Sequence, residues 1–306
     1  MSDAVRLTLE FAAAAALVLV LTPVAIRVAV RTAFFDHPAG YKMHARSTPY
    51  LGGAAVIAGF CTVAALGESF HGLPVILVAA LALTALGTVD DRVGLGIPLR
   101  LAIQAIAALV LWIDDVHWSF TGVDVLDLAI SVVWVVGVAN AFNLLDNIDG
   151  AAASTATASA AGIAGLALVG DSVPAAAVAL ALSGACLGFL PYNLASPSRI
   201  FLGDGGSLPI GCLLAALAMV APVDDGVMGL LAVVPIVGVA LFDTTLVIVS
   251  RRRRGAPVLE GGRDHSTHLL LPRLGSARRV SGLLFLAQGL AAAIVVLVAE
   301  LAVGMS

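Results

Sequence analysis

The chain has 306 residues, of which 60% are hydrophobic and only 12% are charged, and its mean hydropathy is +1.05. This composition excludes an ordinary soluble domain and places the chain among polytopic membrane proteins. The net charge of −4 identifies no partner, because acids and bases gather in different loops.

Ten apolar segments are separated by short polar loops. Most have the ~17–25 residues that cross ~30 Å of hydrocarbon as a helix, and the shorter ones can cross with tilt or in a thinner bilayer. The sequence therefore predicts an all-α integral membrane protein, a bundle of about ten transmembrane helices forming a single domain over residues 1–306, with no separate soluble domain. The first segment is too long for a signal peptide and is expected to be retained. The ten segments span residues 8–30, 52–67, 73–88, 98–113, 126–145, 151–169, 173–192, 207–221, 226–249 and 280–302.

Basic residues are confined to every second loop. Apart from Arg6, every Lys and Arg lies in or beside the loops that open near positions 31, 90, 140, 193 and 251, whereas the intervening loops carry acids and no Lys or Arg. By the positive-inside rule, the basic loops are cytoplasmic and both termini are external, so we expect a protein of the plasma (inner) membrane. The run Arg251–Arg254 is then a stop-transfer flank, and no nucleic-acid partner is expected.

The first basic loop contains the only lysine of the chain, Lys42, next to His44. A lone ammonium beside a histidine suits a phosphate or diphosphate, although an ordinary basic loop is the alternative. Gly52 and Gly53 follow, and we expect them to leave the first N–H groups of the next helix open to an anion.

Two adjacent carboxylates, Asp90 and Asp91, end the third apolar segment. Oxygen ligands of this kind suit Mg²⁺, which commonly takes one or two carboxylates together with substrate phosphate oxygens. One of the pair could instead act as a base. A structural pairing of Asp91 with Arg92 or Arg100 is the remaining alternative.

Asn140, Asn143 and Asp146 recur at a spacing of three, and Asp149 follows them. On a helix, this spacing places the side chains on one polar face at the end of an apolar segment. Their amides and carboxylates suit sugar hydroxyls, base edges or a metal. Helix capping would account for one of the four.

The next basic loop contains Asn193 and the sequence Phe201-Leu202-Gly203-Asp204-Gly205-Gly206-Ser207. Asp204 thus lies among glycines immediately before an apolar helix. We expect Ser207 to cap this helix and the helix dipole to favour a phosphate or its metal.

The last loop contains Arg263, His265 and His268. Two histidines could bind zinc, but a third ligand is not close in sequence, so contacts to a diphosphate or sugar are favoured. Asp243 lies about 12 Å from Arg251 along a helix with a rise of 1.5 Å per residue, which places it inside the bilayer. An intramembrane acid is a functional candidate, and bonding to Thr or pairing with Arg are its alternatives.

Together these motifs resemble the polyprenyl-phosphate N-acetylhexosamine-1-phosphate transferase family, also called glycosyltransferase family 4, from about Asp36 to about Leu274. The resemblance implies transfer of a sugar-1-phosphate from a UDP-sugar to undecaprenyl (polyprenyl) phosphate in cell-wall or surface-polysaccharide synthesis. It also implies release of UMP and dependence on Mg²⁺, for which Mn²⁺ can substitute. The motifs are Lys42-x-His44, Pro49-x-x-Gly52-Gly53, Asp90-Asp91, Asn140-x-x-Asn143-x-x-Asp146-x-x-Asp149-Gly150, Phe201-Leu202-Gly203-Asp204-x-Gly206-Ser207 and His265-x-x-His268.

The resemblance also implies roles for single residues. Asp204 matches the metal-binding carboxylate, and we expect Asp91 to assist it. Asp90 and Asp91 match the pair linked to the acceptor phosphate and to catalysis. The expected substrate-binding residues are Lys42, His44, Asn140, Asn143, Asp146, Asp149, Asn193, Arg263, His265 and His268.

The chain departs from the family pattern at two places, and the second departure favours one branch. Asn147 stands where many members have Gly, and the last loop lacks the three consecutive histidines of the phospho-MurNAc-pentapeptide transferase branch. With Asp243 followed by two threonines, the chain is more similar to the branch that uses UDP-N-acetylglucosamine or a related hexosamine.

Other classes are the alternatives. A CDP-alcohol phosphotransferase also begins Asp-x-x-Asp-Gly, as at Asp146–Gly150, but Ile163 and Ala167 occupy later positions of that pattern. A membrane transporter would place its acids near the membrane midplane rather than at helix ends. Gly-rich helix faces are compatible with a homodimer.

Overall fold

The computed structural model describes residues 2–36, 47–67, 74–221, 229, 232–258 and 262–304. Almost all of the regular structure is helical. The elements are α1 (Asp3–Arg31), α2 (Gly52–Leu66), α3 (Pro74–Val93), α4 (Ile97–Ile113), α5 (Asp124–Leu145), α6 (Ala151–Val169), α7 (Val173–Asn193), α8 (Asp204–Val220), the 3₁₀ turn η2 (Val234–Val237), α10 (Gly238–Arg254), α11 (Ser266–Leu274), α12 (Ala277–Val303), and the strands β1 (Phe35–Asp36) and β2 (Thr48–Pro49).

Helices occupy all ten of the predicted apolar segments within the described residues. Seven are long and apolar enough to cross a membrane, namely α1, α3, α5, α6, α7, η2 with α10, and α12. The shorter apolar helices α2, α4 and α8 correspond to the other three segments. The predicted all-α integral membrane fold is therefore confirmed. The sequence had not indicated α11 or the antiparallel pair of β1 and β2.

Burial separates the inner helices from the outer ones. In both α6 and α7, 78% of the apolar window is buried, against 22% in α1 and 17% in α12. The buried positions of α6 are mostly Ala, Ser, Thr and Gly, which allow neighbouring helices to approach closely. The outer helices expose large apolar side chains, such as Val20 and Leu286, which suits contact with lipid.

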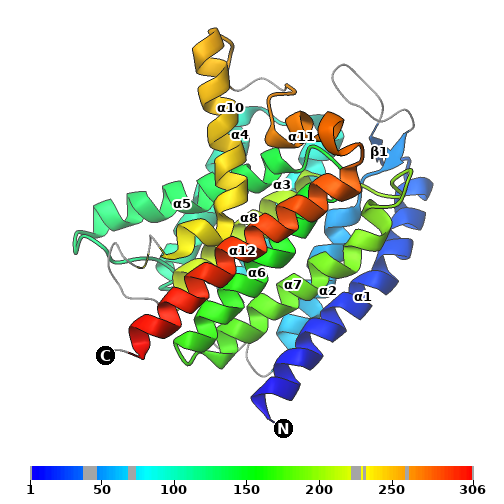
Figure 1. Cartoon of the computed structure of the whole chain (residues 1–306). Helices are drawn as coiled ribbons and strands as arrows, with labels where there is room; N and C mark the ends of the chain where they lie inside the picture. Colours follow the sequence, from blue (N-terminus) through cyan, green and yellow to red (C-terminus); the bar gives the residue numbers. More distant parts are fainter. Residues whose placement is uncertain are drawn as a thin grey trace.

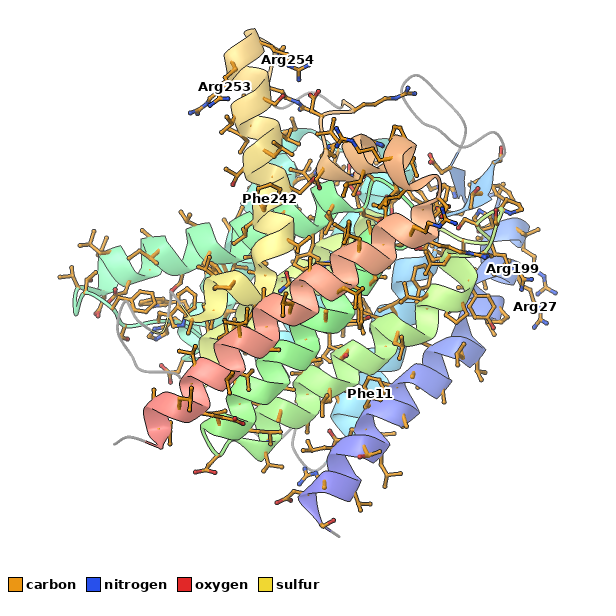
Figure 2. All side chains as sticks on the ribbon, viewed as in Figure 1. Phe11, Arg27, Arg199, Phe242, Arg253 and Arg254 are labelled. Carbon is orange, nitrogen blue, oxygen red and sulfur yellow. The ribbon has the colours of Figure 1, made fainter. Side chains whose placement is uncertain are left out.

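The two termini lie at the same end of the molecule, and β1 and α11 lie at the other (Figure 1). We call this second end the motif end, because it carries Asp91, Asp146 and Asp204. Helix α10 projects beyond its neighbours there, with Arg253 and Arg254 at its tip (Figure 2).

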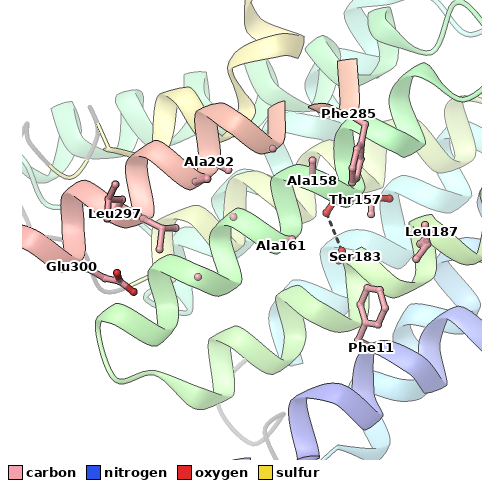
Figure 3. Close-up of a pocket in the computed structure, with 15 residues that line it drawn as sticks. Phe11, Thr157, Ala158, Ala161, Ser183, Leu187, Phe285, Ala292, Leu297 and Glu300 are labelled. Carbon is pink, nitrogen blue, oxygen red and sulfur yellow. Dashed lines mark hydrogen bonds between the residues drawn. The ribbon is translucent and has the colours of Figure 1, made fainter. Parts of the chain in front are cut away.

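An apolar groove with a cavity of about 580 Å³ lies between α6, α7 and α12 (Figure 3). Phe11, Phe285 and Leu297 are among its lining residues, and the Ser183 hydroxyl donates to the Thr157 carbonyl within it at 2.9 Å. None of the acidic or histidine motif residues lines this groove, so the groove is separate from the candidate functional site.

Candidate functional site: an acidic cluster at the start of α8

Close glycine contacts position the first turn of α8. A Cβ atom on Gly53 of α2 would overlap the backbone of Gly206, and one on Gly87 of α3 would overlap the Asp204 carbonyl. The start of α8 is therefore packed directly between α2 and α3, at a distance that only glycine allows.

The backbone N–H groups of Gly52 and Gly53 are already used. They donate to the carbonyls of Phe201 at 3.0 Å and Leu202 at 2.8 Å, in the segment that leads into α8. The expectation that these groups remain open to an anion is therefore wrong. Instead they anchor the chain just before Asp204.

Asp91 of α3 caps α8 from a different helix. Its two carboxylate oxygens accept the backbone N–H of Asp204 at 3.0 Å and that of Gly205 at 3.2 Å. Gly203 has φ +74°, and a Cβ there would lie 2.6 Å from Asp91 Oδ2. The predicted cap by Ser207 is wrong, because the Ser207 hydroxyl donates to the Gly203 carbonyl within the first turn, at 3.0 Å.

Asn143 and Arg100 hold the side chain of Asp204. Asn143 Nδ2 donates to Asp204 Oδ1 at 2.7 Å, and Arg100 Nη1 lies 3.6 Å from Asp204 Oδ2. The same Arg100 atom lies 2.9 Å from Asp90 Oδ2. Arg100 of α4 thus bridges Asp90 and Asp204, and the alternative of a pair with Asp91 is wrong.

Asp90 also closes the turn between α3 and α4. Its side chain is buried, and Oδ1 accepts the backbone N–H of Leu95 at 2.6 Å. Asp90 is therefore fixed between a backbone amide and a guanidinium, while Asp91 faces α8.

Asp146 follows the last residue of α5 and faces the same cluster. Burial and the nearby Asp204 carboxylate raise the pKa of Asp146 to about 8, and a hydrogen bond from the Gly203 amide partly opposes this. Burial and the carboxylates of Asp91 and Asp204 likewise raise the pKa of Tyr50, so this phenol stands close to the cluster.

Sequence reasoning singled out neither Tyr50 nor the bridging role of Arg100. Tyr50 lies in the Pro-x-x-Gly-Gly motif, and its ring packs edge-on against Phe201 with centroids 6.3 Å apart. Arg100 was weighed only as a partner for Asp91. The available signal is its position, because Arg100 lies in the first turn of α4, shortly after the acidic pair Asp90 and Asp91.

The cluster suits a divalent cation that the substrate helps to bind. No set of three or more Asp, Glu, His or Cys side chains forms a complete ligand sphere within the described residues. Mg²⁺ does not need one, because it usually takes one or two carboxylates and completes its octahedron with water and phosphate oxygens. Burial first, and then the neighbouring Asp204 carboxylate, raise the pKa of Asp146, and a cation held between the two carboxylates would favour their ionised forms.

The predicted polar stripe divides where α5 ends at Leu145. Asn143 reaches Asp204, but the Asn140 amide donates to the Gln104 side chain and, at 2.8 Å, to the Val136 carbonyl. Asp149 lies in the turn beyond the helix, close enough to Asp146 to contribute to its raised pKa.

Asn193 joins two loops at the motif end. Its side chain is buried, accepts the Gly150 N–H at 2.7 Å and donates to the Ile200 carbonyl at 3.0 Å. Through these bonds Asn193 links the loop after Asp146 to the segment before Asp204. Its contact with substrate stays a prediction.

The histidines belong to α11 and the residue before it. His265 Nδ1 lies 2.7 Å from Asp243 Oδ2, and the two rings of His265 and His268 meet edge-on with centroids 5.9 Å apart. Burial and the neighbouring His265 lower the pKa of the His268 imidazole. Asp243 therefore has a histidine partner rather than the Thr or Arg considered from the sequence. Arg263 is exposed, and Lys42 and His44 lie outside the described residues.

The arginine run of α10 does more than flank a membrane segment. Arg251 is buried, and its Nε donates to Asp264 Oδ2 at 3.0 Å, while Arg254 Nη2 lies 2.6 Å from Asp264 Oδ1. The hydrogen bonds from Arg251 and Arg254 hold the pKa of Asp264 below its usual range. These contacts hold Asp264, the residue before His265, against α10.

The sequence of the chain is similar to sequences of known proteins. The sequence profile of glycosyl transferase family 4 matches residues 73–221. A probable undecaprenyl-phosphate N-acetylglucosaminyl 1-phosphate transferase of Bacillus subtilis is 30% identical, over 90% of this chain and 80% of its own. A decaprenyl-phosphate N-acetylglucosaminephosphotransferase of Mycobacterium tuberculosis is 32% identical over 87% of this chain and 76% of its own. A phospho-N-acetylmuramoyl-pentapeptide-transferase of Shouchella clausii is 29% identical over 69% of this chain and 71% of its own.

The chain belongs to glycosyl transferase family 4. This membership confirms the family that the motifs resembled and the prediction of a transferase enzyme. It sets aside the CDP-alcohol phosphotransferase and the transporter. The profile covers Asp90, Asp91, Asn143, Asp146 and Asp204, the residues that meet at the start of α8.

Proposed function

We propose that the chain transfers N-acetylglucosamine-1-phosphate from UDP-N-acetylglucosamine to undecaprenyl phosphate, or a similar polyprenyl phosphate, and releases UMP. The observation that carries this proposal is the arrangement around Asp204, whose carboxylate is held by Asn143 and Arg100 while Asp91 fixes its backbone. The N-acetylglucosaminephosphotransferases match more of the chain than the pentapeptide transferase does, which favours N-acetylglucosamine over the phospho-MurNAc-pentapeptide alternative.

The chemistry needs a firmly placed anion site more than a strong base. A polyprenyl phosphate already carries negative oxygens, so one of them can attack the sugar-linked phosphorus of the donor in line. The new P–O bond forms as the bond to UMP breaks, and UMP leaves with that electron pair. A bound Mg²⁺, for which Mn²⁺ could substitute, would neutralise the donor diphosphate.

The residues divide this work between them. We assign metal holding to Asp204 with Asp146, because Asp91 already accepts two amide bonds and serves better to fix Asp204. Asn143 keeps the Asp204 carboxylate in one orientation. Asp90 orients Arg100, whose guanidinium lies beside Asp204 and is assigned to attract a phosphate oxygen of the substrates.

Membrane placement follows from the charges. We propose a single domain in the plasma membrane with the motif end on the cytoplasmic side, where UDP-sugars are made, and with both termini outside. The exposed Arg253 and Arg254 at the tip of α10 support this orientation. Homodimer formation stays a prediction.

The test is release of UMP by purified protein in detergent, supplied with undecaprenyl phosphate, Mg²⁺ and each of several UDP-sugars. We expect release with UDP-N-acetylglucosamine only, and only when both lipid and metal are present. An Asp204→Asn variant is the inactive control. Release with UDP-MurNAc-pentapeptide instead would support the alternative branch, and no release with any UDP-hexosamine from folded protein would contradict the proposal.

A further inference from the structure

Asp243 is fully buried and lies on α10, outside the acidic cluster at the start of α8. Its carboxylate accepts three hydrogen bonds from the beginning of α11. The donors are His265 Nδ1 at 2.7 Å, the Ser266 N–H at 2.7 Å and the Ser266 hydroxyl at 2.6 Å. One carboxylate of α10 therefore caps α11 and fixes the ring of His265.

The bond to Asp243 determines what His265 can offer to a ligand. An ionised carboxylate can only accept, so the proton of this pair lies on Nδ1 of His265, and Nε2 is left for another partner. One turn later, His268 Nδ1 is buried and has no hydrogen-bond partner within the described residues. A buried nitrogen without a partner is unfavourable, because it has lost its hydrogen bonds to water. The first turn of α11 thus keeps unused hydrogen-bonding capacity.

A second contact joins the first turn of α11 to the loop of Asp146–Asp149. Thr267 is fully buried, and its hydroxyl donates to Asn147 Oδ1, while Asn147 Nδ2 donates to the Leu144 carbonyl at 2.7 Å. Asn147 lies between Asp146 and Asp149 in the chain. A glycine at this position would have no side chain to accept this bond.

We propose that Asp243 is a positioning residue of the transfer reaction: with Asn147 it holds His265 and His268 beside the Asp146–Asp149 loop, where their imidazole nitrogens meet a phosphate oxygen of the nucleotide-sugar donor. This inference rests on the proposed function for the identity of the donor. The contacts of Asp243 themselves do not depend on it.

The first test is Asp243→Asn, which keeps the size of the side chain but cannot accept all three bonds. With saturating undecaprenyl phosphate, we expect kcat/KM for UDP-N-acetylglucosamine to fall by roughly 10- to 100-fold, as for other residues that orient a functional histidine. KM for undecaprenyl phosphate should not change, because the histidines that Asp243 positions contact the donor and not the acceptor.

Asp127→Asn is the matched control. Asp127 is also buried, and it accepts the N–H groups of Phe120 at 3.1 Å and Thr121 at 2.9 Å in the loop between α4 and α5, far along α5 from the acidic cluster. Its loss should lower thermal stability without changing either KM or kcat. If Asp243→Asn behaves like this control, Asp243 has only a structural role and the inference is wrong.

Thr267→Val covers the case in which Asp243→Asn does not fold. Valine keeps the shape of threonine and removes the hydroxyl that holds Asn147. The loss of one hydrogen bond is worth about 1 kcal/mol, so we expect kcat/KM for the donor to fall about fivefold with unchanged acceptor KM. Wild-type kinetics in Thr267→Val would overturn the role assigned to this anchor.

A spectroscopic test separates this inference from the proposed function. If wild-type protein releases no UMP from any UDP-sugar, the proposed function fails, but the histidine geometry can still be measured by ¹⁵N NMR of histidine-labelled protein. We expect one imidazole with its proton fixed on Nδ1 in the wild type and in Asp127→Asn, and loss of that signal in Asp243→Asn. An unchanged spectrum in Asp243→Asn would contradict the positioning itself.

Discussion

Asp91 accepts the backbone N–H of Asp204 at 3.0 Å, across 113 residues of sequence, so that one acidic residue caps the helix that begins with the other. A carboxylate at a helix N-terminus is favoured by the open N–H groups and by the helix dipole. Here the capping group comes from a neighbouring helix, and it therefore fixes α3 against α8 as well. The site depends on this contact for the position of Asp204.

Replacing Asp91 by Asn should damage both the fold and the reaction. An amide can accept only one of the two N–H groups, so we expect a loss of about 1 kcal/mol in the free energy of unfolding. Turnover should fall by roughly 10²-fold, because a small displacement of Asp204 is enough to misplace the reacting groups. Thermal unfolding in detergent and UMP release measure the two effects.

Asp171→Asn is the control for this substitution, because Asp171 is exposed in the loop between α6 and α7. It should match wild type in both measurements. Full turnover in Asp91→Asn would show that the cap is dispensable.

Gly203 should not tolerate a side chain, for two separable reasons. Its φ of +74° and ψ of 173° lie in a region essentially restricted to glycine, which costs other residues about 1–3 kcal/mol, and a Cβ would lie 2.6 Å from Asp91 Oδ2. Gly255→Ala is the control for a positive φ without a close contact, since Gly255 has φ +66° and ψ 21°, in the left-handed region, and no neighbouring atom within 4 Å of its added Cβ. We expect Gly203→Ala to unfold at a lower temperature than Gly255→Ala and to lose most UMP release. Equal behaviour of the two variants would mean that the contact with Asp91 is not tight.

The sequence predicted the helices well and the contacts between them poorly. Apolar length and charged loops locate every long apolar helix of the described residues, because each depends on a local run of residues. The role of Asp91 as the cap of α8 depends on a glycine contact between α3 and α8, and no local pattern contains it. The short helix α11 was missed because nine residues with Pro272 give too little periodicity.

Asn140 shows a similar limit within one motif. Its spacing from Asn143 predicts a shared helix face, and both residues do lie on α5. Which neighbour each amide reaches depends on α4, where Gln104 takes Asn140 and Arg100 approaches Asn143 at 3.4 Å. Periodicity identifies the face of a helix, but the partner across it is decided by packing.

Arg100 should have two separable roles. It balances the charge of the buried Asp90, and it supplies a cation beside Asp204 for the reaction. Arg100→Gln leaves a buried carboxylate unpaired, which typically costs about 3 kcal/mol or more, so we expect strongly reduced stability. The double variant Arg100→Gln with Asp90→Asn removes both charges and should recover most of that stability. UMP release should stay low in both variants, because neither places a cation beside Asp204. Recovery of turnover together with stability in the double variant would limit Arg100 to a structural role.

Metal affinity should depend on pH through Asp146. Its pKa of about 8 without metal means that the carboxyl is mostly protonated at neutral pH, whereas a cation binds the ionised form. Raising the pH from about 7 to about 9 should therefore lower the Mg²⁺ concentration that gives half-maximal UMP release, up to roughly tenfold for a single proton displaced across the pKa. The Asp146→Asn variant has no carboxyl proton to lose at this position. The Mg²⁺ concentration that gives half-maximal UMP release should therefore be high and nearly independent of pH. A steep pH dependence that persists in Asp146→Asn would assign the titrating group to another carboxylate of the cluster.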